Sequence, residues 1–233
     1  SKVEEETKSR NLNFFDATCP LVTKVHMEVI KHAKAGRDII LIGHEGHPEV
    51  EGTMGRHINN DNSSIYLVQN ENDANSIKLN KKNELAVVTQ TTLSVDETKS
   101  IISILRDRFP KIITPKKDDI CYATQNRQDA VKQLALESDF MIVVGSKNSS
   151  NSNRLKELGE NCGCKSVLID EFNDLDLDVI KKFSSISITA GASAPESKVM
   201  EIAQSLESFI DAEISEYGED NEDIFFKLPP GLR

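Results

Sequence analysis

Short apolar runs, mostly of β-branched residues, recur along the chain, and each leads into a small polar loop or a turn. Continuous apolar runs of this length are typical of strands that are buried on both faces, as in parallel sheets. The pattern predicts strands over residues 38–42, 85–88, 140–144, 166–169 and 185–188. Apolar residues at helical spacing predict helices over residues 21–30, 94–109, 126–136, 152–158 and 196–210.

The alternation of strands, polar loops and helices predicts βαβ units, and therefore an α/β fold of tandem similar domains with small parallel sheets. We expect one domain over residues 20–117 and the next over residues 118–214, because the proline and charged residues of segment 115–119 suit a hinge. Residues 1–19 precede these domains. The tail, residues 215–233, carries an Ile-Phe-Phe run that is a candidate edge strand.

Composition restricts the classes of partner. With 233 residues, 38% of them hydrophobic, the chain is long enough to bury a core. The net charge is −10, aromatic residues make up 5%, and no Lys/Arg run supplies a basic footprint, so we expect no nucleic-acid partner. No segment approaches the roughly 18–20 apolar residues of a membrane span, so we expect no membrane partner.

Two polar loops carry hydrogen-bond donors that suit phosphate. Ser149, Ser150 and Asn151 follow one predicted strand and precede a helix, and Ser193 lies in the loop after another strand. In open parallel sheets, ligands bind outside the carboxyl ends of the strands, where helix N-termini present free N–H groups. Plain helix capping is the alternative, with Ser193 as a cap and Pro195 in the first turn. The residues alone leave both interpretations open.

A third loop, after the strand predicted at residues 38–42, contains His44, His47 and Glu49. Imidazole can pair with phosphate and a carboxylic acid can deliver a proton, so His47 and Glu49 are candidates for ligand binding and acid catalysis. A zinc site made of His44, His47 and Cys19 is a further alternative, although the loop has no second ligand pair at a familiar spacing.

Four cysteines in a chain without a signal-peptide pattern indicate a cytoplasmic protein, where cysteines bind metal or do chemistry more often than they form disulfides. Cys19 follows a strand-like Phe14-Phe15 pair and precedes a helical pattern, and Cys121 also precedes one. We interpret these two as ligands of a shared metal centre, with inert buried cysteines as the alternative. Cys162 and Cys164, on a turn, are more simply incidental.

Six motifs, taken in order, closely resemble those of the 4-hydroxy-3-methylbut-2-enyl diphosphate reductase (LytB/IspH) family. The resemblance runs from Ser1 to Arg233, and so many long motifs in order are specific enough to favour the functional interpretation of the loops. The motifs cover residues 16–22, 43–53, 89–94, 119–124, 145–152 and 189–195.

The resemblance implies three similar α/β domains, arranged as a trefoil around a central [4Fe–4S] cluster, with one cysteine ligand from each domain and the fourth iron open to substrate. Cys19 and Cys121 match two of the three ligands. Glu49 matches the acid that relays protons to the leaving hydroxyl, and Thr91 matches the residue that works with it. The residues that match the diphosphate-binding groups of the family are His47, Ser149, Ser150, Asn151 and Ser193.

The implied activity is that of an oxidoreductase in isoprenoid biosynthesis. It converts (E)-4-hydroxy-3-methylbut-2-enyl diphosphate to isopentenyl and dimethylallyl diphosphate by two-electron reductive dehydroxylation, the last step of the methylerythritol phosphate pathway. The electron donor implied by the family is reduced ferredoxin or flavodoxin. The runner-up is a phosphoryl-ligand binding or transferase domain without a cluster.

The departure from the family lies at the front of the chain. The family's first domain supplies the first cysteine and two further phosphate-binding histidines, none of which has a counterpart here. We therefore expect residues 1–19 to be the remnant of that domain in an N-terminally truncated chain. Because the fragment lacks the third cysteine ligand, we expect it to be inactive on its own.

Overall fold

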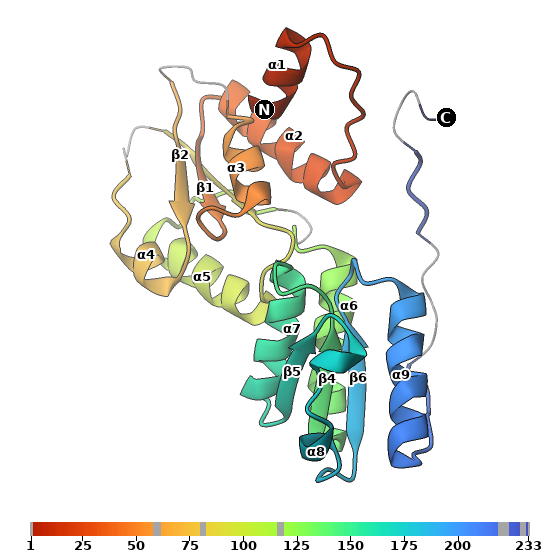
Figure 1. The fold of residues 1–233 in the computed structure, drawn as a ribbon. Helices are drawn as coiled ribbons and strands as arrows, with labels where there is room; N and C mark the ends of the chain where they lie inside the picture. Colours follow the sequence, from red (N-terminus) through yellow and green to blue (C-terminus); the bar gives the residue numbers. More distant parts are fainter. Residues whose placement is uncertain are drawn as a thin grey trace. The chain divides into compact units, whose positions relative to one another are not determined.

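The computed structural model describes residues 2–57, 62–79, 83–115, 119–218, 224–228 and 232. The chain divides into two compact units (Figure 1). The first unit comprises residues 1–91, 95–121 and 222–233, and the second comprises residues 92–94 and 122–221.

The first unit is built on a three-stranded parallel sheet in the order β2-β1-β3. Its strands are β1 (Asp38–Ile42), β2 (Ile65–Val68) and β3 (Leu85–Thr89). Its helices are α1 (Lys2–Ser9), α2 (Pro20–Lys34), α3 (Pro48–Met54), α4 (Glu71–Ser76) and α5 (Val95–Arg108).

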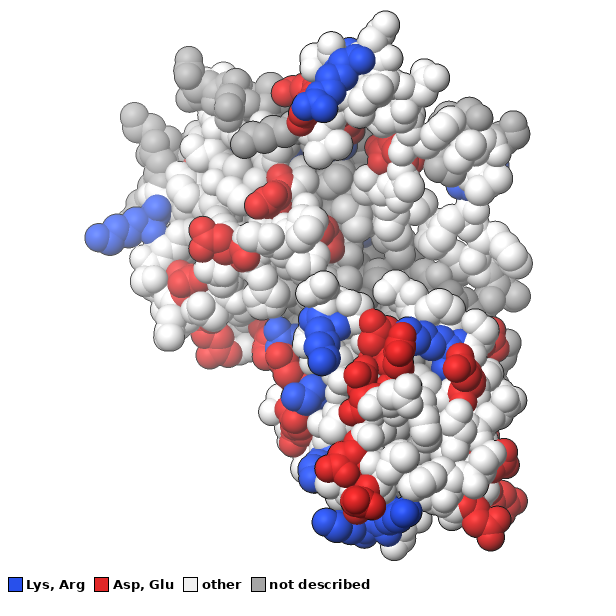
Figure 2. Space-filling view, in the orientation of Figure 1, with Lys and Arg blue, Asp and Glu red and all other residues white. Residues whose placement is uncertain are grey.

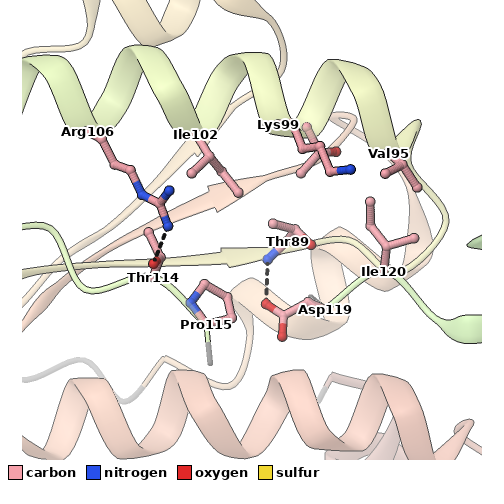
Figure 3. Close-up of a pocket in the computed structure, with 10 residues that line it drawn as sticks. Thr89, Val95, Lys99, Ile102, Arg106, Thr114, Pro115, Asp119 and Ile120 are labelled. Atoms are coloured by element: carbon pink, nitrogen blue, oxygen red, sulfur yellow. Dashed lines mark hydrogen bonds between the residues drawn. The ribbon is translucent and has the colours of Figure 1, made fainter. Parts of the chain in front are cut away.

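The core of the first unit forms on both faces of β1, whose five residues are all buried. On one face Ile39 and Leu41 cluster with Val25 and Val29 of α2 and with Val50 of α3. Helix α5 lies across β3 from α2 (Figure 3). Burying one such aliphatic side chain stabilises the fold by about 1.5–3 kcal/mol. The packed sheet therefore holds the ends of the loops at its carboxyl edge in fixed positions.

The second unit repeats this plan with the strand order β5-β4-β6, again all parallel. Its strands are β4 (Phe140–Val144), β5 (Lys165–Ile169) and β6 (Ile186–Ala190). Its helices are α6 (Tyr122–Glu137), α7 (Ser150–Asn161), the 3-10 helix η1 (Phe172–Asp174), α8 (Leu177–Ile180) and α9 (Glu196–Ile210).

Two clusters fill the second unit, one on each face of β4. Phe140 and Ile142 pack with Ile202 of α9, and Met141 and Val143 pack with Leu155 of α7. The alternation of β4 residues between the two clusters follows from the two-residue period of a strand. The prediction of an α/β fold with small parallel sheets is therefore confirmed.

Local differences from the sequence prediction have simple causes. Strand β2 was not predicted, because its four residues lie at a sheet edge and three are only half-buried. The interpretation of Phe14-Phe15 as strand-like is wrong, because both residues lie in irregular backbone and are 41% and 53% exposed. The run Ile224–Phe226 is not a strand either. Of the expected hinge, residues 116–118 lie outside the described residues.

Candidate functional site

His47 is the N-cap of α3, in the loop that follows β1. Its Nδ1 accepts a hydrogen bond from the backbone N–H of Glu49 at 3.2 Å. Burial, with His44 nearby, lowers the pKa of His47, which favours the neutral imidazole. With Nδ1 acting as acceptor, the proton of the neutral ring lies on Nε2, which is then a donor for a ligand.

Glu49, in the first turn of α3, is paired with Thr91. One carboxylate oxygen, Oε1, accepts the backbone N–H of Thr91 at 2.7 Å, and Oε2 accepts the Thr91 hydroxyl at 3.1 Å. Burial raises the pKa of Glu49, and the hydrogen bonds from Thr91 partly oppose this. A carboxyl group that keeps its proton to a higher pH than usual and is held in one orientation can serve as a general acid.

Cys121 lies next to this pair. Its backbone N–H donates to the carbonyl oxygen of Thr91 at 3.0 Å, so Glu49, Thr91 and Cys121 form one hydrogen-bonded series. Cys121 is half-buried and directly precedes α6.

Cys19 is the N-cap residue of α2 and is exposed, and its side chain makes no cap hydrogen bond. The Nζ atom of Lys24 on α2 lies 3.3 Å from Oδ1 of Asp119, two residues before Cys121, so α2 is tied to that segment. Both cysteines directly precede a helix, and iron–sulfur clusters are held by cysteine side chains. This chemistry fits a cluster ligand.

Asp119 was not singled out from the sequence, although it supports the same segment. Its carboxylate is buried, accepts the backbone N–H of Thr89 at 3.1 Å and pairs with Lys24. Burial, with a contribution from Glu28, raises the pKa of Asp119 to about 6. Neither its place in the expected hinge nor its place in motif 119–124 indicated this role, because its burial arises from tertiary packing.

A complete metal site is not formed by the described residues. Among them, no group of three or more His, Cys, Asp or Glu side chains is placed to hold a metal ion. The zinc alternative with His44, His47 and Cys19 therefore finds no support in this part of the chain.

A small cavity of about 50 Å³ lies beside α5 and the end of β3 (Figure 3). Arg106 extends from α5 and donates to the Thr114 hydroxyl at 2.9 Å. The hydroxyls of Thr89 and Thr98, which line the cavity, have no hydrogen-bond partner among the described residues. The volume exceeds the roughly 10–15 Å³ that one water needs, so hydration would satisfy them. Because Asp119 also lines the cavity, its polar lining is mixed in charge, and we assign it no ligand.

In the second unit, Ser149 is the N-cap of α7, and its Oγ accepts the backbone N–H of Ser152 at 3.2 Å. The Ser149 hydroxyl hydrogen remains free to donate to a ligand. Ser150 opens the helix, and its Oγ lies 3.5 Å from the hydroxyl of Thr92. The capping interpretation is thus correct for Ser149, and capping leaves its donor function intact.

Asn151 is the sharpest feature of this loop. Only 4% of it is exposed, yet neither Oδ1 nor Nδ2 has a hydrogen-bond partner in the described part of the chain. Leaving a buried polar group unpaired costs about 1–3 kcal/mol, and native proteins contain few such groups. At the carboxyl end of a parallel sheet, where ligands bind in this class of fold, such an amide can serve as a hydrogen-bonding group.

Ser193 is exposed in the loop after β6, and it does not cap α9. Pro195 takes the N-cap position instead, so the expected capping role of Ser193 is wrong. Arg127 of α6, a residue that the sequence analysis missed, contacts the end of the same strand. Its Nε donates to the carbonyl oxygen of Ala190 at 3.1 Å, which brings a positive charge to the end of β6.

Acidic and basic side chains are interspersed over the second unit on the face shown in Figure 2. A diphosphate would therefore rely on local donors such as Ser149 and Asn151 more than on a broad positive surface. Within the described residues, no helix combines the length and the apolar character needed to cross a membrane.

Comparison with known proteins gives consistent matches along the chain. A family model described as LytB protein matches residues 1–207. A 4-hydroxy-3-methylbut-2-enyl diphosphate reductase of Alcanivorax borkumensis is 54% identical over 231 residues, which cover 99% of this chain and 74% of the relative. The enzyme of the same name from Psychrobacter arcticus is 52% identical and covers 99% and 73%.

Solved structures agree. The E-1-hydroxy-2-methyl-but-2-enyl-4-diphosphate reductase of Plasmodium falciparum superposes with a TM-score of 0.89 at 36% identity, over 98% of this chain and 71% of that one. A second structure, of an (E)-4-hydroxy-3-methyl-but-2-enyl diphosphate reductase, gives a TM-score of 0.57 at 29% identity, over 89% and 72%.

Proposed function

The chain belongs to the LytB protein family, and on that premise we propose that it carries reductase machinery for (E)-4-hydroxy-3-methylbut-2-enyl diphosphate. The products are isopentenyl and dimethylallyl diphosphate, formed in the cytoplasm as the last step of the methylerythritol phosphate pathway. Two electrons, supplied by reduced ferredoxin or flavodoxin, and protons remove the allylic hydroxyl as water.

The observation that carries the proposal is the series Glu49–Thr91–Cys121. Loss of a hydroxyl group requires a proton, because water leaves more readily than hydroxide. Glu49 is a part-buried carboxyl with a raised pKa, so it can hold that proton. Thr91 fixes both carboxylate oxygens and, through its carbonyl oxygen, holds the backbone of Cys121. A proton donor and a candidate metal ligand are thus joined within one unit.

The diphosphate is assigned to neutral donors. The N–H of Ser152 donates to a lone pair of Ser149 Oγ, so the hydroxyl hydrogen of Ser149 can still be donated to a ligand. Asn151 has no hydrogen-bond partner for either amide atom among the described residues. In the first unit, taken by itself, His47 can donate from Nε2. In the second unit, Ser150 and Ser193 add hydroxyl groups at the carboxyl end of the sheet that precedes Ser149 and Asn151. Hydrogen bonds to charged acceptors are stronger than neutral ones, so these donors suit a multiply charged group.

A [4Fe–4S] cluster, when bound, would supply the electrons and a Lewis-acidic iron for the allylic oxygen. Cys19 and Cys121 are the residues of this chain that would hold it. Cys162 and Cys164 lie in a turn of the second unit, where burial raises the pKa of the Cys164 thiol and makes it a poor ligand. Because two thiolates are fewer than a stable cluster needs, we expect the 233-residue polypeptide on its own to be inactive.

Anaerobic reconstitution with iron and sulfide tests the proposal. We expect sub-stoichiometric iron, with absorbance near 400 nm (the region in which iron–sulfur clusters absorb), and we expect Cys19→Ser or Cys121→Ser to abolish both. The double variant Cys162→Ser/Cys164→Ser is the matched control and should retain the wild-type iron content.

The assignment would be contradicted if the iron content fell in the Cys162→Ser/Cys164→Ser variant, or if it were unchanged in Cys19→Ser and Cys121→Ser. A stoichiometric, EPR-active cluster on the wild-type chain would overturn the expectation of inactivity. If no iron binds but pyrophosphate does, the cluster-free phosphoryl-ligand binding function is favoured.

A further inference from the structure

Ser152, one residue beyond the candidate diphosphate donors, lies at the point where two loops of the second unit meet. It is fully buried, and its Oγ has no hydrogen-bond partner among the described residues. Its neighbours are Gly145, which follows β4, and Gly191, which follows β6. Because β4 and β6 pair with Val144 opposite Ala190, these two glycines come next to each other at the sheet end.

The contact leaves no room for a larger residue. A methyl group at Gly145 or at Gly191 would lie within 3.0 Å of Ser152 Oγ, a distance that real side chains essentially never show. The same methyl groups would lie 3.0 Å and 3.3 Å from Ser152 Cβ, respectively. Neither glycine has a positive φ, so close packing, and not backbone conformation, requires glycine here.

Ser152 connects this contact to the candidate donors. Its N–H donates to Ser149 Oγ, so a shift of Ser152 would also shift the Ser149 side chain. Gly191 lies two residues before Ser193, at the start of the other loop. A single small side chain therefore touches the backbone of both loops.

We propose that Ser152 is a positioning residue, which sets the spacing between the Ser149–Asn151 loop and the Ser193 loop by its contact with Gly145 and Gly191. The inference rests on the proposed function, because its purpose is to hold diphosphate donors in register. Sites that bind through several fixed donors lose affinity when their supports shift by about 0.5 Å. Ser152 acts through the contact of its side chain with the two glycines and through its N–H, which donates to Ser149.

The test compares Gly191→Ala with Gly191→Ala/Ser152→Ala in the 233-residue chain. Binding of inorganic pyrophosphate is measured by calorimetry, and the backbone amides of Ser149 and Ser150 are followed by NMR. We expect Gly191→Ala to weaken pyrophosphate binding about tenfold and to shift both amides. Adding Ser152→Ala removes the clashing oxygen, so it should restore most of the affinity and return the amides toward wild-type positions.

Gly145→Ala provides an internal comparison. Its methyl group would remain 3.0 Å from the Cβ of residue 152, against 3.3 Å for Gly191→Ala. Ser152→Ala should therefore rescue Gly145→Ala less completely than it rescues Gly191→Ala. Equal rescue, or none for either glycine, would contradict the proposed contact.

Gly159→Ala is the matched control. A methyl group at Gly159 would also lie within 3.0 Å of a serine hydroxyl, that of Ser166, but at the packing of α7 against β5. It should lower stability in the same way as Gly191→Ala and leave pyrophosphate affinity within about twofold of wild type. If the two variants weaken binding equally, Ser152 has only a structural role.

The two proposals fail in different ways. If the wild-type chain does not bind pyrophosphate, the proposed diphosphate site is wrong, and the NMR arm still tests the positioning role. If Gly191→Ala leaves the Ser149 and Ser150 amides unmoved, the positioning role is overturned whatever the affinity. If Gly191→Ala does not fold, recovery of folding in Gly191→Ala/Ser152→Ala supports the contact, and failure to recover refutes it.

Discussion

The two units share a frame, a three-stranded parallel sheet with its first strand in the centre, and polar residues occupy matching positions after these strands. In both, the first strand is central and is followed by a glycine, Gly43 or Gly145. Four residues later comes the N-cap of the next helix, His47 in one unit and Ser149 in the other.

The two units differ in the hydrogen bonds that the side chain of the second helical residue makes. Glu49 and Asn151 each lie two residues after their cap. Glu49 receives two hydrogen bonds from Thr91, whereas Asn151 has no partner among the described residues. The register of the third strands accounts for the hydroxyl hydrogen bond, because Thr91 and Ala192 are both two residues beyond the strand end, and alanine has no hydroxyl.

The comparison shows that the sheet fixes where a side chain lies, and the loop across from it decides what that side chain can do. In the first unit the acid is held by two hydrogen bonds from Thr91, and burial raises its pKa. In the second unit the amide has no partner within the described part of the chain, which leaves it available to a ligand. Substitutions in the shared frame and at the residues that differ test this comparison.

The largest effect should come from the shared frame. Ile40 and Ile142 are the middle residues of the two central strands, and both are fully buried. Ile40→Ala and Ile142→Ala should each lower the free energy of unfolding by about 2–5 kcal/mol, measured by urea denaturation. A cost below about 1 kcal/mol for one of them would show that the two frames are not equivalent.

Asn151→Ala should separate binding from stability. It removes an unpaired buried amide, so the unfolding free energy should change little or rise, while pyrophosphate affinity falls about tenfold or more. Asn153→Ala is the control, because Asn153 Nδ2 donates to the carbonyl oxygens of Lys147 and Ser149. That variant should lose about 1–2 kcal/mol of stability. The reverse pattern would contradict a ligand role for Asn151.

Ala192→Thr tests the comparison directly. Ala192 is exposed, so a threonine can be accommodated, and its hydroxyl would lie where Thr91 lies in the first unit. If it pairs with Asn151, the amide is no longer free and pyrophosphate binding should weaken by a few-fold, about threefold. Ala192→Val adds similar bulk without the hydroxyl and should have a smaller effect. Calorimetry on the two variants distinguishes them.

The smallest effect concerns the pH dependence of stability. Burial raises the pKa of Glu49 above its ordinary 4.5, so the stability from this carboxyl is complete below 4.5 and is lost as pH rises through the folded-state pKa. The unfolding free energy of the wild type should therefore fall relative to that of Glu49→Gln across this window. Thr91→Val, which removes a hydrogen bond to the carboxylate, should raise the pKa further, and carbon NMR titration of Glu49 measures it. A pKa below 4.5 in the wild type would refute this account.

Much of the frame was predictable from sequence because it depends on local patterns. The apolar runs 38–42 and 140–144 match β1 and β4 residue for residue, since buried central strands have continuous apolar sequences. Edge strand β2 was missed, because a half-buried run of four residues gives a weak pattern. The Phe14-Phe15 pair failed as a strand because apolar character alone does not provide a pairing partner.

Within the candidate site, residue types could be chosen from sequence but their partners could not. His47, Glu49 and Ser149 follow apolar runs, so their position at strand ends was expected. The pairing of Glu49 with Thr91 joins residues 42 positions apart and depends on the register of β1 and β3. Asp119 and Arg127 gave no sequence signal, since a buried carboxylate and a guanidinium bound to a strand-end carbonyl both arise from tertiary packing.

The most direct test of the account is an NMR titration of the isotope-labelled chain with (E)-4-hydroxy-3-methylbut-2-enyl diphosphate. The account predicts saturable shifts of the Asn151 side-chain amide and of the Ser149, Ser150 and Ser193 backbone amides, all with one dissociation constant. Saturable binding that leaves Asn151 unmoved, or no binding at millimolar ligand, would contradict it.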